Sequence, residues 1–183
     1  ASADQLVLSY YRTYGTKCVI TRCSNNFGPY QYPEKLIPKT IILALKNKKI
    51  PLHGGGSQLR NWIYVLDHIS AIEQLVTKCR FGEIYNISAN AEFSVRDIVE
   101  KILTILDKPL ELLENVDDRP GQDKKYSINS HKIQTEIGWK PKFSFDDTLR
   151  ETVFWYRDNP NWWSSIINDK ILHPQQWTVN WKH

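Results

Sequence analysis

The chain has 183 residues, of which 41% are hydrophobic, enough to bury the core of one domain, and this argues against a disordered chain. Its 24 Lys and Arg residues against 20 Asp and Glu residues leave a net charge of only +4, and the absence of a basic run, a zinc finger or an RRM-like motif argues against nucleic-acid binding. Three cysteines without Cys-x-x-Cys spacing, no apolar run of membrane-span length and no basic-then-apolar signal segment together predict a soluble, cytoplasmic protein without a metal site.

The first predicted element is a helix from Ser2 to Thr13, which has apolar residues at helical spacing and ends before Gly15. Ser2 permits a capping box with Gln5 at a genuine start of the helix, although an absent upstream continuation fits the pattern equally well, and the chain contains no methionine. Residues 18–21 predict a buried strand that leads into the polar, turn-rich stretch 23–29. Because α/β proteins place ligand contacts where a strand runs into a polar loop, we expect binding residues in this stretch.

A second helix is predicted over residues 36–45, with Pro38 tolerated in its first turn, and strands are predicted at 50–53 and 61–65. Gly54-Gly55-Gly56 lacks the Gly-Lys-Ser/Thr ending of a P-loop, so we expect a flexible hairpin turn between these strands.

The rest of the chain continues the alternation of strands and helices. In chain order we expect a helix capped by Asp67, a strand at 83–87, a helix opened by a capping box of Ser94 and Asp97, a strand at 110–113, a charged loop at 117–125, a strand at 126–128, a helix at 131–137 that ends at Gly138, and a last helix from Ser144 to Tyr156. Four of the seven tryptophans lie in the tail from residue 159 to 183, which we therefore expect to pack against other elements. This alternation favours an α/β layer structure.

Two arginines have the chemistry to hold a charged ligand. Arg60 follows the glycine-rich turn and precedes a strand, where its guanidinium can grip a phosphate through two parallel hydrogen bonds. Arg119 stands beside a rigid Pro-Gly corner, which is also suited to a charged ligand group. From spacing alone, a solvated surface arginine is the more common outcome at both positions.

Other candidate residues lie near the expected cleft. Asn25 and Asn26 can each offer a donor and an acceptor to a ligand, although Asn in turns usually serves its own backbone. His53 and His68 lack the sequence partners of a catalytic dyad or a metal set. The residues by themselves therefore predict a ligand-binding α/β domain without a complete active site.

The stretch from Cys23 to Pro38, CSNNFGPYQYPEKLIP, resembles the signature loop of the dTDP-glucose 4,6-dehydratases, which belong to the extended short-chain dehydrogenase/reductase superfamily. Segments with family-like sequence and spacing follow at residues 51–53, 60–65, 85–87 and 118–123. The resemblance implies that residues 1–183 form the C-terminal, nucleotide-sugar-binding region of such an enzyme. Residues 1–22 and about 83–88 would then be remnants of an NAD(P)-binding, Rossmann-like half that is otherwise absent.

The resemblance also implies an activity. These lyases of deoxysugar biosynthesis use NAD to oxidise the glucose C4 hydroxyl, eliminate water across C5 and C6, and return the hydride to C6. A Gly-rich dinucleotide loop, a Thr-Asp-Glu segment and a Tyr-x-x-x-Lys pair do this work in the family, and this chain has none of them. We therefore expect the chain alone to be inactive and assign it no catalytic residue.

The resemblance assigns roles residue by residue. Asn25 would hold the substrate and Asn26 would touch the cofactor. Lys35 and Leu36 would line the nucleotide-sugar pocket, and Pro51 and His53 would border the base. Arg60 would bind the pyrophosphate, and Arg119 with neighbours including Gln122 would close over the nucleotide. Gln122 stands where many relatives carry His, and Val95 where bacterial members often carry Asn, so an NDP-sugar other than dTDP-glucose stays open as the substrate. An epimerase or decarboxylase of the same superfamily and a non-catalytic binding module are the alternatives, and family members commonly form homodimers.

Overall fold

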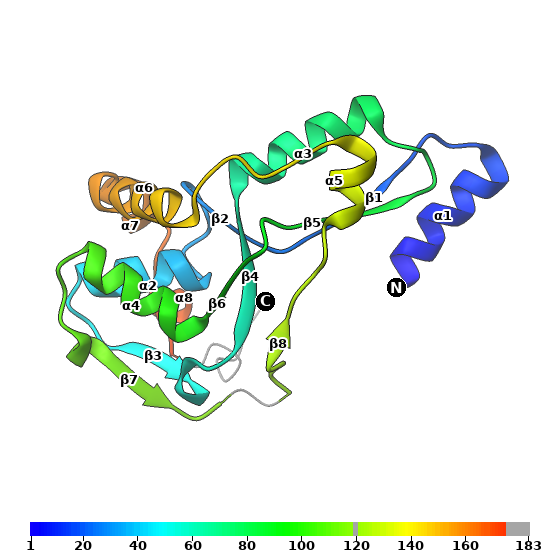
Figure 1. The fold of residues 1–183 in the computed structure, drawn as a ribbon. Helices are drawn as coiled ribbons and strands as arrows, with labels where there is room; N and C mark the ends of the chain where they lie inside the picture. Colours follow the sequence, from blue (N-terminus) through cyan, green and yellow to red (C-terminus); the bar gives the residue numbers. More distant parts are fainter. Residues whose placement is uncertain (119–120, 175–183) are drawn as a thin grey trace. The chain divides into compact units, whose positions relative to one another are not determined.

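The computed structural model describes residues 1–118 and 121–174 (Figure 1). Contacts along the chain divide it into two compact units. The first unit comprises Ala1–Asn26, Asn61–Glu92 and Tyr126–Phe145, and the second unit comprises Phe27–Arg60, Phe93–Lys125 and Asp146–His183. In the described ranges no helix combines the length and the apolar character needed to cross a membrane.

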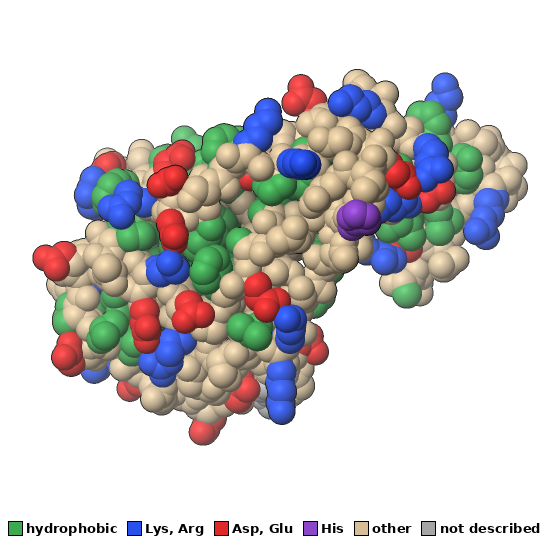
Figure 2. All heavy atoms as spheres, viewed as in Figure 1, with side chains coloured by type: hydrophobic (Ala, Val, Ile, Leu, Met, Phe, Trp, Pro, Cys, Tyr) green, Lys and Arg blue, Asp and Glu red, His purple; other side chains and the backbone are tan. Residues whose placement is uncertain are grey.

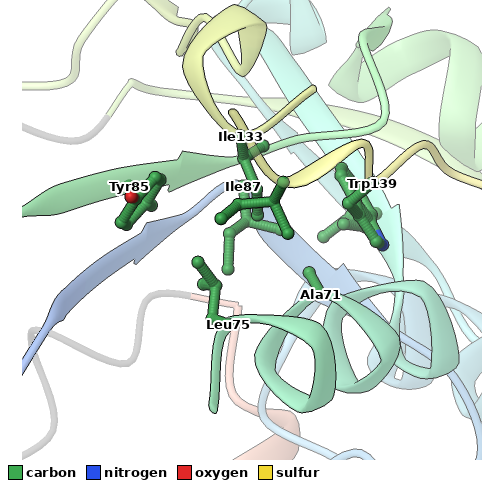
Figure 3. Packing of buried hydrophobic residues seen from close by; sticks show 8 residues of the cluster. Ala71, Leu75, Tyr85, Ile87, Ile133 and Trp139 are labelled. Carbon is green, nitrogen blue, oxygen red and sulfur yellow. The ribbon is translucent and has the colours of Figure 1, made fainter. Parts of the chain in front are cut away.

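The first unit is built around a pair of parallel strands. Its elements are α1 (Ser2–Tyr14), β1 (Ile20–Cys23), α3 (Val65–Lys78), β5 (Ile84–Ile87) and α5 (His131–Ile137). The pairing of β1 with β5 runs from Ile20 opposite Ile84 to Cys23 opposite Ile87. In the core of this unit, side chains of β5, α5 and Trp139 face α3 (Figure 3), and the buried set is Ile63, Ala71, Leu75, Tyr85, Ile87, Ile133, Ile137 and Trp139.

The second unit pairs a second set of parallel strands and covers them with helices. Its elements are α2 (Leu36–Leu45), β3 (Ile50–His53), the 3-10 turn η1 (Gly54–Gly56), α4 (Val95–Ile105), the 3-10 turn η2 (Leu110–Leu112), β7 (Leu113–Val116), α6 (Phe145–Asp158), α7 (Pro160–Ser164) and α8 (Asp169–Leu172). Strand β3 pairs with β7 in parallel, from Ile50 opposite Leu113 to His53 opposite Val116. The apolar face of α4 packs on α2 and β3 through the buried residues Leu43, Ala44, Ile50, Leu52, Val99 and Leu103.

The remaining strands lie where the chain passes from one unit to the other. They are β2 (Asn25–Phe27), β4 (Leu59–Tyr64), β6 (Ala91–Ser94) and β8 (Lys125–Tyr126). They hydrogen-bond in the order β2-β4-β6, with β8 on β4.

Elements that depend on local sequence signals are confirmed. The first helix ends at Gly15, whose φ of 65° is the left-handed conformation expected of a glycine cap. Ser94 and Asp97 form the predicted capping box, with Asp97 N donating to Ser94 Oγ at 3.1 Å and Ser94 N donating to Asp97 Oδ2 at 2.9 Å. The α/β class and the helices at 36–45 and 131–137 are confirmed as well.

The predicted hairpin at Gly54-Gly55-Gly56 is wrong. The strands on either side of it do not pair with each other, since β3 pairs with β7 while β4 joins β2, β6 and β8. All three glycines have positive φ, and a Cβ on Gly54 would lie 2.6 Å from Asp118 Oδ2. Gly54 therefore lies close to Asp118 in the loop that follows β7, and all three residues of the turn have the left-handed conformation that favours glycine.

The predicted cap at Asp67 is also wrong. Helix α3 begins at Val65, two residues earlier, and Asp67 is 1% exposed inside its first turn. Its carboxylate accepts hydrogen bonds from Lys142 N at 2.8 Å and Phe143 N at 3.4 Å. Asp67 thus ties a distant loop to α3 rather than capping its own helix.

Several boundaries differ from the prediction. The strand expected at 110–113 is the turn η2 followed by β7, the strand expected at 18–21 begins at Ile20, the one expected at 126–128 is β8 at Lys125–Tyr126, and the polar stretch 23–29 contains β2. Strand β6 was not predicted, and α7 and α8 follow the helix that we expected to be the last. In the tail, Trp163 is buried and Trp162 packs edge-on against Trp155, whereas Trp177 and Trp181 lie outside the described residues.

Candidate functional site

The predicted site residues fall in both units. Asn25 and Asn26 belong to the first unit, and Lys35, Leu36, Pro51, His53, Arg60 and Gln122 belong to the second. Arg119 lies outside the described residues.

Asn26 lies on β2 with its side-chain amide held at both ends. Its Nδ2 donates to Ser24 O at 3.1 Å and to Cys23 Sγ at 3.2 Å, and its Oδ1 lies 2.9 Å from His68 Nδ1. Asn25 precedes it on the same strand and is half-buried. Since successive strand residues point to opposite faces, these two amides present themselves to opposite sides of β2.

Two buried polar atoms lie around the Asn26 amide without a hydrogen-bond partner among the described residues, namely Ser24 Oγ and His68 Nε2. Ser24 is only 3% exposed, and burial lowers the pKa of His68, which favours the neutral imidazole. A buried hydroxyl or ring nitrogen without a partner costs free energy, roughly 1–3 kcal/mol. A further polar group in this region could therefore form hydrogen bonds with these two atoms.

His53 closes β3 in the second unit, and both of its ring nitrogens are bonded. Nδ1 lies 3.1 Å from Asp117 O and Nε2 lies 3.0 Å from Pro174 O. Pro51, two residues earlier on the same strand, is half-buried. The ring of His53 thus joins the end of β3 to the loop after β7.

Arg60 stands near the start of β4, where its guanidinium is fixed by backbone carbonyls. Its Nη1 donates to Leu59 O at 2.7 Å and its Nη2 donates to Asp123 O at 2.8 Å. A carbonyl oxygen orients the guanidinium without neutralising its charge, and Arg keeps that charge at any working pH. The arrangement is suited to an anion held against β4.

Gln58 ties the loop after β7 to β3, and sequence analysis did not single it out. It is 4% exposed, and its Nε2 donates to His53 O at 2.9 Å and approaches Asp118 Oδ1 at 3.3 Å. The same loop carries Gln122, whose buried Oε1 has no partner among the described residues. Gln58 lies between the family-like segments 51–53 and 60–65, so no sequence signal pointed to it.

Lys35 and Leu36 have different surroundings. Lys35 is exposed at the start of α2 and its Nζ lies 3.8 Å from Glu34 Oε1. Leu36 is half-buried and packs against the core shared by α2, β3 and α4. Leu36 therefore has a packing role, and its contact with a ligand stays a prediction.

Two hollows lie away from the predicted site residues. A groove of about 730 Å³ between α4 and α6 is lined by Phe93, Asp97, Lys101 and Arg150 among others, and Lys101 Nζ bonds Asp146 Oδ1 across it at 2.8 Å. A polar hollow of about 370 Å³ in the first unit is lined by Asn90, Ser127, Ile128, Asn129, His131 and Gln134. Neither includes a predicted site residue. Among the described residues, no cluster of His, Cys, Asp or Glu could hold a metal ion.

Comparison with known proteins relates most of the chain to sugar-nucleotide dehydratases. The sequence model of the family described as GDP-mannose 4,6 dehydratase matches residues 1–152. A dTDP-glucose 4,6-dehydratase of Shigella flexneri is 44% identical over 184 residues, which cover 97% of this chain and 50% of the relative.

Two solved structures of dTDP-glucose 4,6-dehydratases resemble the chain closely. The enzyme from Bacillus anthracis in complex with NAD has a TM-score of 0.87 and 48% identity, covering 91% of this chain and 53% of that one. The enzyme from Streptomyces venezuelae with NAD and TYD bound has a TM-score of 0.88 and 40% identity, covering 90% of this chain and 51% of that one. The chain thus spans about half the length of the curated relatives that it matches.

Proposed function

Because the chain belongs to the GDP-mannose 4,6-dehydratase family, we propose that it is the nucleotide-sugar-binding half of an NAD-dependent dTDP-glucose 4,6-dehydratase. The whole protein would convert dTDP-glucose to dTDP-4-keto-6-deoxyglucose. The observation that carries this proposal is the 44% identity to a dTDP-glucose 4,6-dehydratase across 97% of the chain. Residues 1–22 and about 83–88 would belong to the Rossmann-like half of that protein.

The first unit has features of a part that packs against further protein. Among the described residues its parallel sheet consists of two strands, β1 and β5, whereas parallel sheets are normally larger and covered on both faces. Apolar side chains are exposed on α1, where Figure 2 shows them between charged residues, and also on α3; the larger ones are Leu6, Tyr10, Tyr14, Leu66, Ile69 and Val76. Large exposed apolar faces commonly mark interaction surfaces. Further protein, either a Rossmann-like half or a second copy, would cover them.

The region around Asn26 fits a cofactor with a polar head group. Its amide is oriented by three contacts, and Ser24 Oγ and His68 Nε2 are buried polar atoms that lack partners among the described residues. NAD, when bound, supplies the acceptor that takes a hydride from the sugar and later returns it. Asn26 would contact this cofactor and Asn25 would hold the sugar, while the acid/base work falls to residues outside this chain.

The second unit supplies the groups for the nucleotide. Arg60 would hold the pyrophosphate because its guanidinium is preoriented by two carbonyls and keeps its charge. The other proposed contacts are Pro51 and His53 at the base, Lys35 and Leu36 along the pocket, and Arg119 and Gln122 from the loop that Gln58 anchors. Because Gln122 replaces a His of many relatives, the preference for dTDP has to be tested against other nucleotides.

The proposal is tested by turnover in the presence and absence of the remaining half. The chain mixed with dTDP-glucose and NAD should form no 4-keto product, whereas the full-length protein should form it. Calorimetric titration of the full-length protein with dTDP-glucose, UDP-glucose and GDP-mannose should favour the first, because the wrong base loses pocket contacts. Turnover by the chain alone, or a full-length protein that neither binds nor converts dTDP-glucose, would contradict the proposal.

Replacing Arg60 by Ala in the full-length protein should weaken dTDP binding by about tenfold or more, as expected for the loss of a charge-assisted contact. Arg157 on α6 provides the matched control, since its guanidinium pairs with Asp158 on the exposed surface. Arg157→Ala should leave binding unchanged. Equal affinities for the two variants would remove Arg60 from the site.

We further propose that the protein works in the cytoplasm as a homodimer. The three cysteines are free, as expected in a reducing compartment, and the exposed apolar side chains of α1 could be covered by a second copy. Light scattering of the full-length protein should give twice the monomer mass, and Tyr10→Glu on α1 should lower it. A full-length protein that is monomeric at micromolar concentration would contradict the dimer.

A further inference from the structure

A hydrogen bond between His68 and Asn26 joins α3 to β2 inside the first unit. His68 Nδ1 lies 2.9 Å from Asn26 Oδ1, although the residues are 42 positions apart. The other end of the amide is held by Ser24 O and Cys23 Sγ. The side chain that is proposed to meet the cofactor is therefore fixed on both sides.

The orientation of this amide follows from its neighbours. The carbonyl of Ser24 can only accept a hydrogen bond, so the group of Asn26 that faces it at 3.1 Å must be the NH₂. The opposite end, which faces His68, is then the oxygen. An amide oxygen accepts only, and His68 Nδ1 must therefore carry a proton.

The ring of His68 is in its neutral form with the proton on Nδ1. A charged ring would place a second N–H donor at Nε2, which is buried and has no partner among the described residues. An unpartnered buried donor on a cation is more costly than an unpartnered neutral acceptor. Burial also lowers the pKa of His68, which agrees with the neutral form.

We propose that His68 is a positioning residue for the reaction, which donates from Nδ1 to Asn26 and so fixes the amide in the orientation that the cofactor needs. This inference rests on the proposed function, because it takes Asn26 to be a cofactor contact. Without the donor, only the contacts of Nδ2 with Ser24 O and Cys23 Sγ hold the amide, and its oxygen loses its fixed position. His68 acts through Asn26 and needs no contact with substrate.

Substitutions at residue 68 in the full-length protein separate positioning from packing. His68→Asn keeps a donor near the place of Nδ1, whereas His68→Leu keeps the bulk and removes the donor. We expect His68→Leu to weaken NAD binding by about tenfold, the size expected of one lost hydrogen bond to a held polar group, and His68→Asn to restore most of it. His131→Leu, at an exposed position on α5, is the matched control and should leave NAD binding unchanged.

A double-mutant cycle tests whether His68 acts through Asn26. Asn26→Ala should weaken NAD binding, and adding His68→Leu to that variant should cause no further loss. Additive losses, or a His68→Leu protein with wild-type NAD affinity and kcat, would overturn the proposal. If His68→Leu does not fold, the test compares His68→Asn with His68→Gln, because Gln places its donor nearer the position of Nε2. Equal NAD affinities of the Asn and Gln variants would also overturn the proposal.

Nitrogen NMR keeps this proposal apart from the proposed function. The spectrum of the full-length protein should show His68 protonated at Nδ1 and unprotonated at Nε2, whether or not NAD binds. A protein with this signature that fails to bind NAD would refute the proposed function and leave the His68–Asn26 bond standing. A ring protonated at Nε2 would refute the positioning role even in an active enzyme.

Discussion

Gln58 should stabilise the loop after β7, which is proposed above to contact the nucleotide. It is 4% exposed, and its amide holds His53 O at 2.9 Å and Asp118 Oδ1 at 3.3 Å, so that one side chain joins β3 to the loop that carries Arg119 and Gln122. Gln58→Leu keeps the volume and removes both donors. The buried carbonyl of His53 then loses a partner.

The size of the effect follows from these contacts. One good hydrogen bond to a carbonyl and one longer one to a carboxylate contribute together about 1–3 kcal/mol. If half of this loss appears as disorder of the loop before binding, dTDP affinity should fall about twofold to twelvefold. The thermal midpoint of the full-length protein should fall by a few degrees at the same time.

Calorimetric titration with dTDP and a thermal melt of the same samples would measure both effects. Gln134→Leu is the matched control, because Gln134 also donates from Nε2, at 3.0 Å to Ser130 Oγ, but lies in the first unit. This control should lose stability without losing dTDP affinity. If Gln58→Leu binds dTDP as tightly as the wild type, the loop is not organised by Gln58 and the reasoning is refuted.

Three further predictions concern the two units. Asp67→Asn should lower the free energy of unfolding by about 2–4 kcal/mol, because two backbone N–H groups lose a charged acceptor. Urea denaturation measures this free energy, with Asp147→Asn at an exposed position as the control. Gly54→Ala should destabilise the protein more than Gly55→Ala. Both residues have positive φ, but of the two only a Cβ on Gly54 would approach Asp118 Oδ2, to 2.6 Å. Equal melting points of the two variants would contradict the clash. Burial lowers the pKa of Lys39 from its ordinary value of 10.5 to about 8, so the unfolded chain binds more protons than the folded one between these values, and the free energy of unfolding should rise with pH across that window. Lys39→Met should abolish the rise. A wild-type denaturation profile that is flat over this pH range would contradict the prediction.

The local sequence determined most of the helices and the turns that end them. Ser94 with Asp97, and the glycines after α1 and α5, act within three or four residues of themselves, so their signals can be recognised without knowing the fold. The stretch from Cys23 to Pro38 also sufficed to indicate the family, because its order of residues is specific.

Contacts between distant residues were decided only by the tertiary structure. The two strands on either side of the three glycines were expected to pair with each other. Instead, the first of them, β3, pairs with β7, and Ile50 lies opposite Leu113, about sixty residues away in the sequence. Asp67 binds the backbone of Lys142, and His68 binds Asn26, across 75 and 42 positions. Backbone propensity and capping act over a few residues, whereas strand pairing and buried hydrogen bonds depend on which surfaces the whole chain brings together, and no local pattern contains that information.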